Sequence, residues 1–370
     1  MRVLHINCNY IGTTLHQLMI ENLDALGYCN QVFVPTYDKN LAVIVPNKNV
    51  CICECFKKWD RLFFDYKQKK IFNAVESNYS LKKYDLIHAY TLFTDGNCAR
   101  KLFQKHGIPY VVAVRNTDVN DFFRLMPHLR GRGVRIMLDA KAVFFLSEAY
   151  RKQVFEKYIP KKYQDSIQKK THIIPNGIDD FWFNNTPTSE NAIVSKVKLI
   201  YAGRIDRNKN IPSIQAATKL LRDKGYDVSL TVVGKVADKK VFDTIQKDAY
   251  TECFPPKPKE ELINLYRAHN IFVMPSFTES FGLVYAEAMS QGLPVIYSKG
   301  QGFDNQFHEG EVGYRVDSHS TKSVAEGILK VIENYGNISP YVSQKAVKFR
   351  WDDIVKTYGD IYQKISDTVT

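Results

Sequence analysis

The chain has 370 residues, of which 45% are hydrophobic, 24% charged and 13% aromatic. This is the composition of a globular protein, and it excludes collagen-like and intrinsically disordered chains. The length predicts two domains, each large enough to bury its own core. No apolar run reaches the ~18 residues of a membrane-spanning helix, and the first ten residues have a strand pattern rather than that of a signal peptide, so we expect a cytoplasmic protein.

The charge is divided unevenly along the chain. Of the formal net charge of +12, residues 1–170 carry all of the excess, with 27 Lys and Arg against 15 Asp and Glu, while residues 171–370 hold 24 of each. Residues 57–70 combine six bases and two acids with four aromatic residues at helical spacing. Two interpretations remain open. The segment lies on an anionic membrane surface, which would make the protein peripheral on the inner face of the membrane, or it is a solvated helix face with its aromatic side chains packed inward.

The seven cysteines are an odd number and are scattered, so we expect no disulfide framework. Cys51, Cys53 and Cys55 alternate along a predicted strand, and neither a C-x-x-C pair nor a nearby histidine supplies the usual zinc spacing. We interpret them as buried strand thiols, with a metal ligand set as the alternative.

Strands and helices alternate in the first half of the chain. In chain order the pattern predicts a strand at 2–7, a turn at 9–14, a helix at 15–26 that ends at Gly27, a strand at 86–89, a helix to about 106 that stops at Gly107, and strands at 110–114 and 142–146. This alternation favours a parallel sheet covered on both faces.

A second series of the same kind follows. It consists of strands at 197–203, 228–233, 271–274 and 294–297 and helices at 211–224, 260–268 and 281–291. We therefore expect an α/β fold of two doubly wound, Rossmann-like domains at 1–177 and 196–350. A polar linker at 178–195 would join them, and an amphipathic helix at 351–370 would pack back on the first domain. Ligands bind beyond the carboxyl ends of such strands, so two facing sheets would share a central cleft.

The first cluster of chemistry-bearing residues lies between a strand and a helix. Gly203 allows a ligand to approach the backbone, and Arg204 with Lys209 can hold a phosphate between two cations. The alternative is a polar surface loop.

The second cluster surrounds the start of the helix predicted at 281–291. Glu279 precedes the free backbone N–H groups of Phe281, Gly282 and Leu283, and Glu287 follows eight residues after Glu279. A helix amino end suits an anion and a carboxylate suits hydroxyl groups, so the pair indicates a sugar and phosphate site. The alternative is a capping Glu279 with Glu287 at the edge of the core.

Together the two clusters resemble the donor site of the family 4 retaining glycosyltransferases, whose GT-B architecture has two facing Rossmann-like domains and a central cleft. The shared pattern is G-R-x-x-x-x-K-N, followed about 70 residues later by E-S-F-G-L-x-x-x-E. The turn at 173–179, Ile-Ile-Pro-Asn-Gly-Ile-Asp, the strand at 294–296 and the segment from Trp351 are also similar. The resemblance covers the second half closely and the first half mainly through the order of its elements.

The resemblance implies roles for the donor-site residues. Arg204 and Lys209 would bind the diphosphate of a UDP- or GDP-sugar, and Glu279 would hold hydroxyl groups of the transferred sugar, so that these three residues are catalytic. Glu287 would bind the ribose. The implied enzyme is a retaining hexosyltransferase that needs no metal and no cofactor, because protein cations stabilise the departing diphosphate.

The first domain departs from the family pattern. Its first turn has only Gly12, which we place on the donor side, and the family's pair of His with Gly or Asp is replaced at 114–118 by Val-Arg-Asn-Thr-Asp. We expect His88, Arg115, Asn116 and Asp118 on the acceptor side, since each lies at or just past a predicted strand end. For His88 a structural role is the alternative. The expected acceptor is a saccharide or a polyprenyl-linked saccharide of surface-polysaccharide biosynthesis.

Three other functions compete with sugar transfer. A nucleotide-sugar epimerase would share the architecture and the donor. A nicotinamide dehydrogenase would require G-x-G-x-x-G after the first strand, which residues 9–14 lack. A nucleic-acid-binding protein would use the basic half but would leave Glu279 and Glu287 without a role, so we expect no nucleic-acid partner.

Overall fold

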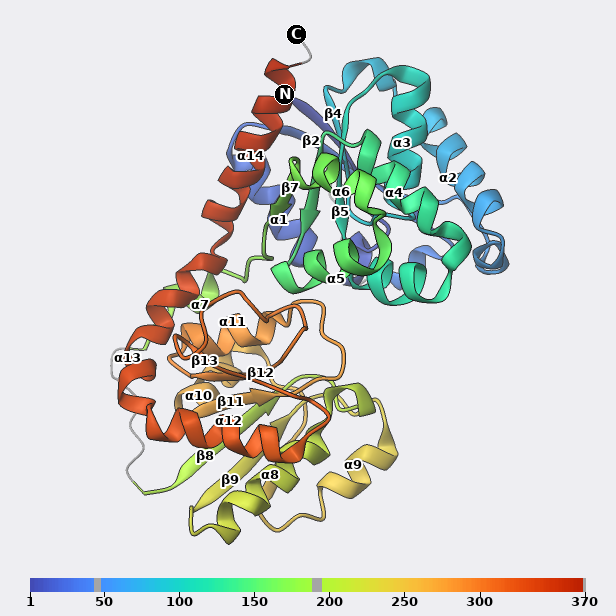
Figure 1. The fold of residues 1–370 in the computed structure, drawn as a ribbon. Coiled ribbons are helices and arrows are strands. Elements are labelled where there is room, and N and C mark those ends of the chain that lie inside the picture. Colours follow the sequence, from blue (N-terminus) through green and yellow to red (C-terminus); the bar gives the residue numbers. More distant parts are fainter. Residues whose placement is uncertain (43–47, 188–194, 369–370) are drawn as a thin grey trace. The chain divides into compact units, whose positions relative to one another are not determined.

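The computed structural model describes residues 1–42, 48–187 and 195–368, which form two compact units (Figure 1). The first unit comprises Met1–Leu146, Tyr150–Gly177 and Trp351–Thr370, and the second comprises Ser147–Ala149 and Ile178–Arg350. Parts of two predictions, 188–194 of the linker and 369–370 of the final helix, lie outside the described residues.

The first unit is built on a seven-stranded parallel sheet with the order β3-β2-β1-β4-β5-β6-β7. The strands are β1 (Arg2–Ile6), β2 (Cys29–Thr36), β3 (Val50–Glu54), β4 (Leu86–Ala89), β5 (Tyr110–Val114), β6 (Ala142–Phe145) and β7 (Thr171–Ile173). The direction in which strands are added reverses between β1 and β4, which is the position where doubly wound sheets bind ligands.

Helices cover both faces of this sheet. They are α1 (Leu15–Ala25), α2 (Phe64–Asn78), α3 (Asp95–His106), α4 (Arg130–Asp139), α5 (Glu148–Tyr158), α6 (Lys161–Gln168) and α14 (Trp351–Asp367). Alternate residues of β1 enter two separate cores: Val3 joins the core under α1 and α14, and Leu4 joins the core under α2, α3 and α4. The final helix α14 packs beside α1 (Figure 1).

The second unit repeats the plan with six parallel strands in the order β10-β9-β8-β11-β12-β13. The strands are β8 (Val197–Ala202), β9 (Val228–Val233), β10 (Thr251–Phe254), β11 (Ile271–Met274), β12 (Val295–Ser298) and β13 (Gly313–Val316). The helices are α7 (Phe181–Asn184), α8 (Ile211–Asp223), α9 (Lys239–Ile245), α10 (Lys259–Arg267), α11 (Leu283–Ser290), α12 (Thr321–Glu333) and α13 (Tyr335–Ala346). Here the strand order reverses between β8 and β11.

The predicted fold class, two doubly wound parallel α/β domains, is confirmed. The predicted start of one helix is wrong. Helix α11 begins at Leu283 rather than at Phe281, because Gly282 before it adopts a left-handed conformation with φ of 77°. A Cβ atom at Gly282 would also lie 2.5 Å from the ring of Tyr285, so both the turn and the packing require glycine.

Candidate active site

The loops that follow β8 and β11 meet at the point where the strand order of the second unit reverses. The two strands are neighbours in the sheet, with Leu199 paired to Ile271. Parallel neighbours end at the same edge of a sheet, so the loop from Gly203 to Asn210 and the loop from Pro275 to Gly282 leave the sheet side by side. This edge is where a doubly wound sheet binds its ligand.

Glycine shapes the start of the first loop. Gly203 has φ of 149° and Gly234, at the end of the neighbouring strand β9, has φ of 159°. A Cβ atom at Gly234 would lie 1.7 Å from the carbonyl oxygen of Gly203. The two backbones therefore approach more closely than any residue with a side chain permits.

Asn208 joins the two loops. Its Nδ2 donates to the carbonyl oxygen of Thr278 at 2.8 Å, and its Oδ1 accepts from the N–H of Thr278 at 3.0 Å. The N–H of Phe277 also donates to the carbonyl oxygen of Asn208 at 2.8 Å. The residues next to these bonds, Lys209 and Glu279, are thereby held in a fixed relation.

Lys209 and Glu279 form an ion pair, with Nζ 2.5 Å from Oε2. Both side chains are largely buried, at 16% and 10% exposure. Arg204 differs, because its side chain is 63% exposed and its Nε donates to Asp206 Oδ2 at 2.5 Å. The site thus holds one buried cation beside a carboxylate and one exposed cation.

A third loop, after β12, supports Glu279. The N–H of Glu279 donates to Gln301 Oε1 at 2.9 Å, and its carbonyl oxygen accepts from the N–H of Gly302 at 2.9 Å. A Cβ atom at Gly302 would lie 1.9 Å from the carbonyl oxygen of Ser280, so this contact also requires glycine. The sequence analysis missed Gln301 and Gly302; the available signal was the pair of glycines, Gly300 and Gly302, directly after a predicted strand.

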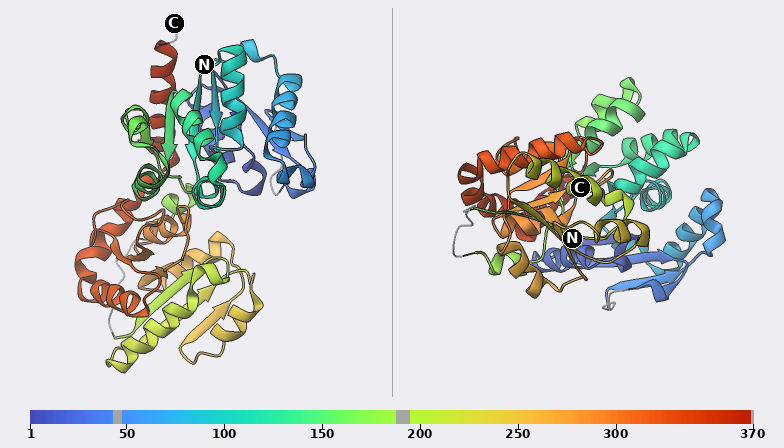
Figure 2. Two further views of the ribbon diagram at one scale, coloured as in Figure 1. Left: turned by 45° about the vertical axis from the view of Figure 1, so that its right-hand side comes forward. Right: turned by 90° about the horizontal axis from the view of Figure 1, so that it is seen from below.

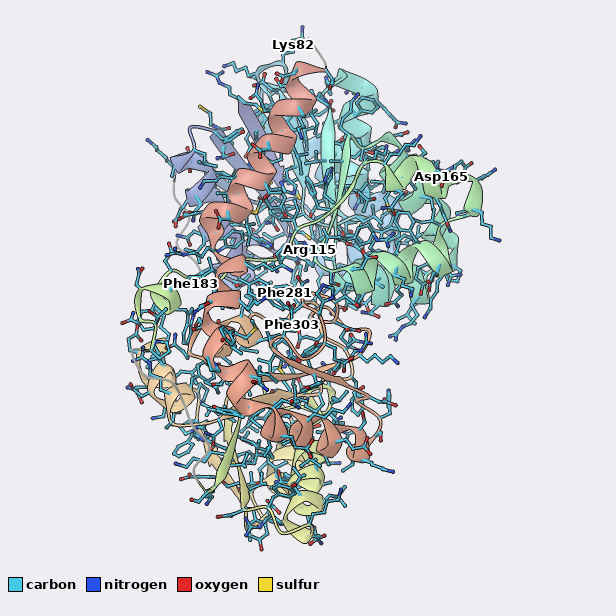
Figure 3. The ribbon with its side chains drawn as sticks, turned by 60° about the vertical axis from the view of Figure 1, so that its left-hand side comes forward. Lys82, Arg115, Asp165, Phe183, Phe281 and Phe303 are labelled. Atoms are coloured by element: carbon cyan, nitrogen blue, oxygen red, sulfur yellow. The ribbon has the colours of Figure 1, made fainter. Side chains whose placement is uncertain are left out.

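Phe281 anchors the amino end of α11 in the core. Its ring packs 5.5 Å from that of Phe349 and 6.4 Å from that of Phe303, and Figure 3 shows Phe281 and Phe303 side by side. Helix amino ends carry N–H groups without intrahelical partners. Binding of an anion by the amides of Phe281, Gly282 and Leu283 remains a prediction.

Glu287 has different neighbours from Glu279. It is half-buried on α11, near the ion pair in which Lys259 Nζ lies 2.7 Å from Asp179 Oδ2. Burial, together with the smaller effect of the Asp179 charge, raises the pKa of Glu287 to about 7, and the charge of Lys259 opposes both. The two glutamates therefore occupy distinct environments, Glu279 in the loop before α11 and Glu287 in the second turn of α11.

In the first unit, Gly12 lines a cavity of about 510 Å³ at the carboxyl ends of β1, β2 and β3. Lys67 and Arg61 also line it; Lys67 lies over the ring of Phe56 at 5.1 Å, and Arg61 lies over that of Tyr37 at 5.7 Å. Burial lowers the pKa of Lys67. Within the described parts of the chain, neither cation has a carboxylate at ion-pair distance.

Asp95 joins the loops after β1 and β4, and the sequence analysis did not identify it. It is fully buried and accepts from Thr91 Oγ1 at 2.9 Å and from the N–H of Cys8 at 3.3 Å. Burial raises its pKa to about 7. It thus fixes the backbone at the strand reversal of the first unit, beside the cavity that Cys8 lines.

His88 lies inside the core beneath α14. Its Nδ1 is 2.6 Å from Tyr362 Oη, its ring stacks on Tyr90 at 4.2 Å, and it has no exposed surface. Burial lowers the pKa of His88 well below the ordinary histidine value.

Asp118, Arg115 and Asn116 shape the loops after β4 and β5. Asp118 is buried and accepts from the N–H groups of Leu92 and Arg115, and burial raises its pKa to about 6. Arg115, labelled in Figure 3, donates from Nη1 to Asn176 Oδ1 at 3.1 Å. Asn116 Oδ1 accepts from Tyr150 Oη at 3.2 Å and also from the side chain of Asn120.

Among the residues that the structure describes, no three His, Cys, Asp or Glu side chains gather as a metal site would. Cys51, Cys53 and Cys55 are partly buried and pack against the core under α2 and α3. Burial raises the pKa of Cys55 to about 12. None of the described helices combines the length and apolar character needed to cross a membrane.

Two doubly wound parallel sheets, each with a strand reversal, define a fold of the GT-B class. Comparison with known families agrees: "Glycosyl transferases group 1" matches residues 184–348, and "Glycosyltransferase Family 4" matches residues 13–180. The chain belongs to glycosyltransferase family 4, group 1.

Its relatives include a D-inositol 3-phosphate glycosyltransferase of Pseudarthrobacter chlorophenolicus, 27% identical over 266 residues. This match covers 66% of the chain but only 61% of the relative's length. A probable sucrose-phosphate synthase of Thermosipho melanesiensis is 26% identical, with 74% of the chain and 69% of the relative covered.

Solved structures share the fold. The sucrose-phosphate synthase of Thermosynechococcus elongatus is similar with a TM-score of 0.76 at 18% identity, and 100% of each chain is covered. HepE of Anabaena, solved in complex with UDP, has a TM-score of 0.72 at 15% identity, with 98% of this chain and 100% of HepE covered.

Proposed function

We propose that this chain is a retaining glycosyltransferase that moves a hexose from a UDP- or GDP-sugar to a saccharide or lipid-linked saccharide. The observation that carries the proposal is the ion pair of Lys209 and Glu279 at the strand reversal of the second unit. A diphosphate and the sugar attached to it present negative charge and hydroxyl groups next to each other. A cation can bind the negative charge while the carboxylate in contact with it accepts hydrogen bonds from the hydroxyl groups.

On this proposal each donor-site residue has one task. Lys209 and Arg204 bind the diphosphate and stabilise the negative charge that grows on it as the bond to the sugar breaks. Glu279 accepts hydrogen bonds from hydroxyl groups of the sugar and so positions its reacting carbon. Glu287, in the second turn of α11, accepts hydrogen bonds from the ribose. Because protein cations balance the leaving group, the reaction proceeds without a metal ion.

We further propose that the acceptor enters the first-unit cavity and carries an anionic group. Lys67 and Arg61 line this cavity without carboxylate partners among the described residues, and the rings of Phe56 and Tyr37 beside them suit the face of a sugar. A phosphate on the acceptor would satisfy both cations. The relatives are named for phosphate-bearing compounds, which agrees with this choice. A polyprenyl-phosphate-linked saccharide of surface-polysaccharide biosynthesis would have such a group.

The experiment is to incubate the protein with UDP- and GDP-sugars in the presence of EDTA, with and without phosphorylated and unphosphorylated saccharides. The proposal expects a product of retained anomeric configuration from one donor, with a phosphorylated acceptor preferred. Conversion of the donor sugar to its epimer without an acceptor would instead establish the epimerase alternative. Complete loss of transfer in EDTA, restored by a divalent cation, would contradict metal independence.

A further inference from the structure

The segment Lys57–Lys70 presents large apolar side chains to solvent. It forms a short 3-10 helix, Lys58–Leu62, followed by the start of α2. The exposed fractions are 77% for Trp59, 73% for Leu62, 66% for Phe63 and 53% for Tyr66. These four residues, the exposed apolar patch, lie within eight consecutive positions: Trp59 and Leu62 on the 3-10 helix, Phe63 at the junction and Tyr66 in the first turn of α2.

The aromatic residues of this segment divide between core and surface. Phe64 faces inward and packs 6.0 Å from Phe122. The interpretation in which all the aromatic side chains pack inward is therefore wrong for Trp59, Phe63 and Tyr66. Figures 1 and 2 show α2 as the outermost helix of the first unit, so its amino end lies at the edge of that unit.

The charges of the segment that have no ion-pair partner among the described residues are positive. Both acids of the segment are already neutralised: Asp60 lies 2.6 Å from Lys70 Nζ, and Asp65 forms an ion pair with Arg132. Lys57, Lys58 and Lys69 are exposed and have no ion pair with any carboxylate of the described chain. The other three of the six bases are engaged elsewhere, since Lys70 binds Asp60 and both Arg61 and Lys67 line the first-unit cavity.

We propose that the exposed apolar patch and these three lysines dock the first unit on an anionic membrane surface. Four bulky apolar side chains in solvent mark an interaction surface. Tryptophan and tyrosine favour the interface between lipid and water, and each lysine near an anionic leaflet contributes about 1 kcal/mol. The charge excess of the first half, 27 bases against 15 acids, acts in the same direction. Docking here would bring the first-unit cavity, which Arg61 and Lys67 of the same segment line, to the height of lipid headgroups.

Vesicle binding tests this proposal without donor or acceptor, so its result is independent of the proposed function. Wild-type protein is mixed at low salt with vesicles of phosphatidylcholine alone or of phosphatidylcholine and phosphatidylglycerol in equal parts, and the bound fraction is measured by sedimentation. We expect binding to the anionic vesicles, weakened by added salt. Absence of any preference for anionic vesicles would overturn the proposal.

Two variants and a matched control locate the surface. Combining Lys57→Glu, Lys58→Glu and Lys69→Glu should weaken vesicle binding by about 10²-fold or more, because at least ~3 kcal/mol of lysine attraction is removed. The double variant Trp59→Ser, Phe63→Ser should weaken it by at least about tenfold, because both rings leave the interface. All five side chains are exposed, so the melting temperatures should stay near that of wild type.

The control reverses three exposed lysines elsewhere on the first unit, Lys82, Lys161 and Lys169, all to Glu. Its net charge equals that of the triple lysine variant. Lys82, labelled in Figure 3, lies in the 3-10 helix Leu81–Lys83, beyond the carboxyl end of α2, whose 15 residues span about 22 Å from Phe64. We expect the control to keep most of the vesicle binding. An equal loss in the control, or full binding by the Trp59→Ser, Phe63→Ser variant, would overturn docking through this patch.

Discussion

Lys209 Nζ lies 2.5 Å from Glu279 Oε2, although 70 residues separate the two in the sequence. Adjacent strands bring their loops together, and Asn208 bonds one loop to the other beside the pair. Because both side chains are largely buried, each charge depends on the other when no ligand is bound. A diphosphate that arrives beside Lys209 would share this cation and leave Glu279 free to accept from sugar hydroxyl groups.

Loss of either donor-site cation should lower turnover, and loss of the exposed one, Arg204, should do so without a change in stability. We expect Lys209→Ala and Arg204→Ala each to lower turnover by roughly 10²–10³-fold, because each removes stabilisation of the leaving diphosphate. Arg204→Ala should leave the melting temperature unchanged, since this side chain is 63% exposed. Arg207→Ala is the control: it removes a neighbouring base that is 75% exposed and pairs with Asp238. Turnover near normal in both of the first two variants would remove the donor-site assignment.

Substitution of the two glutamates should have different effects on nucleotide affinity. Glu287→Gln should weaken the binding of free UDP or GDP by about 10- to 100-fold, because a charged hydrogen bond to the ribose is lost. Glu279→Gln should spare nucleotide binding and impair transfer, since it leaves Lys209 without its carboxylate but still able to bind phosphate. Calorimetry with the free nucleotide measures the first effect. Equal losses of nucleotide affinity in the two variants would contradict these roles.

Glu287 should also make stability depend on pH. Its pKa in the folded protein is about 7, above its ordinary value, so the unfolded chain gives up this proton at lower pH than the folded chain. Stability is therefore lost as the pH rises from about 4.5 to about 7, and the cost persists above that range. We expect Glu287→Gln to raise the free energy of unfolding by about 1–3 kcal/mol at about pH 8 and by much less at about pH 5. Denaturant unfolding at the two pH values measures this, and an equal effect at both would contradict it.

The acceptor cavity should depend on Lys67. We expect Lys67→Ala to raise KM for a phosphorylated acceptor by roughly 10- to 100-fold, because a charged hydrogen bond is lost, while KM for the donor stays the same. Lys69→Ala is the matched control, since this lysine is exposed two residues away and is absent from the cavity lining. A second comparison measures the effect of Lys67→Ala on KM for a phosphorylated and for an unphosphorylated acceptor. If Lys67→Ala impairs phosphorylated and unphosphorylated acceptors equally, the cavity does not read an anionic group.

The buried histidines should make the first unit sensitive to acid. Burial lowers the pKa of His5 to about 4 and that of His16 to about 3, and His88 also stays neutral when folded. A base with a lowered pKa contributes stability that is present above about pH 6.5 and is lost as the pH falls, because the unfolded chain binds the proton. His88→Gln should reduce the loss of unfolding free energy between about pH 7 and about pH 5 by about 1–2 kcal/mol. His128→Gln, at an exposed site, should leave that loss unchanged, and the same slope in both variants would contradict this account.

The sequence alone determined the order and much of the extent of the elements. Parallel strands that are buried on both faces appear in the sequence as short continuous apolar runs. Because such runs are easy to locate, the predicted strands at 86–89, 228–233 and 271–274 coincide with β4, β9 and β11. Gly107 ends α3 with φ of 75°, as a glycine after an amphipathic run predicts. The motifs G-R-x-x-x-x-K-N and E-S-F-G-L-x-x-x-E also sufficed to indicate the family, because each is a local pattern of residue types and the two occur in the expected order.

The tertiary structure decided which side chains meet. The pairing of Lys209 with Glu279, the support of Glu279 by Gln301 and Gly302, and the burial of His88 under Tyr362 all join residues that are distant in the chain, and no local pattern specifies such partners. The segment at 57–70 shows the same division. Its composition left inward and outward aromatic side chains both open. The structure packs Phe64 on Phe122 and leaves the rings of Trp59, Phe63 and Tyr66 in solvent. Periodicity reports which residues share a face of a helix, whereas burial depends on whether another element covers that face.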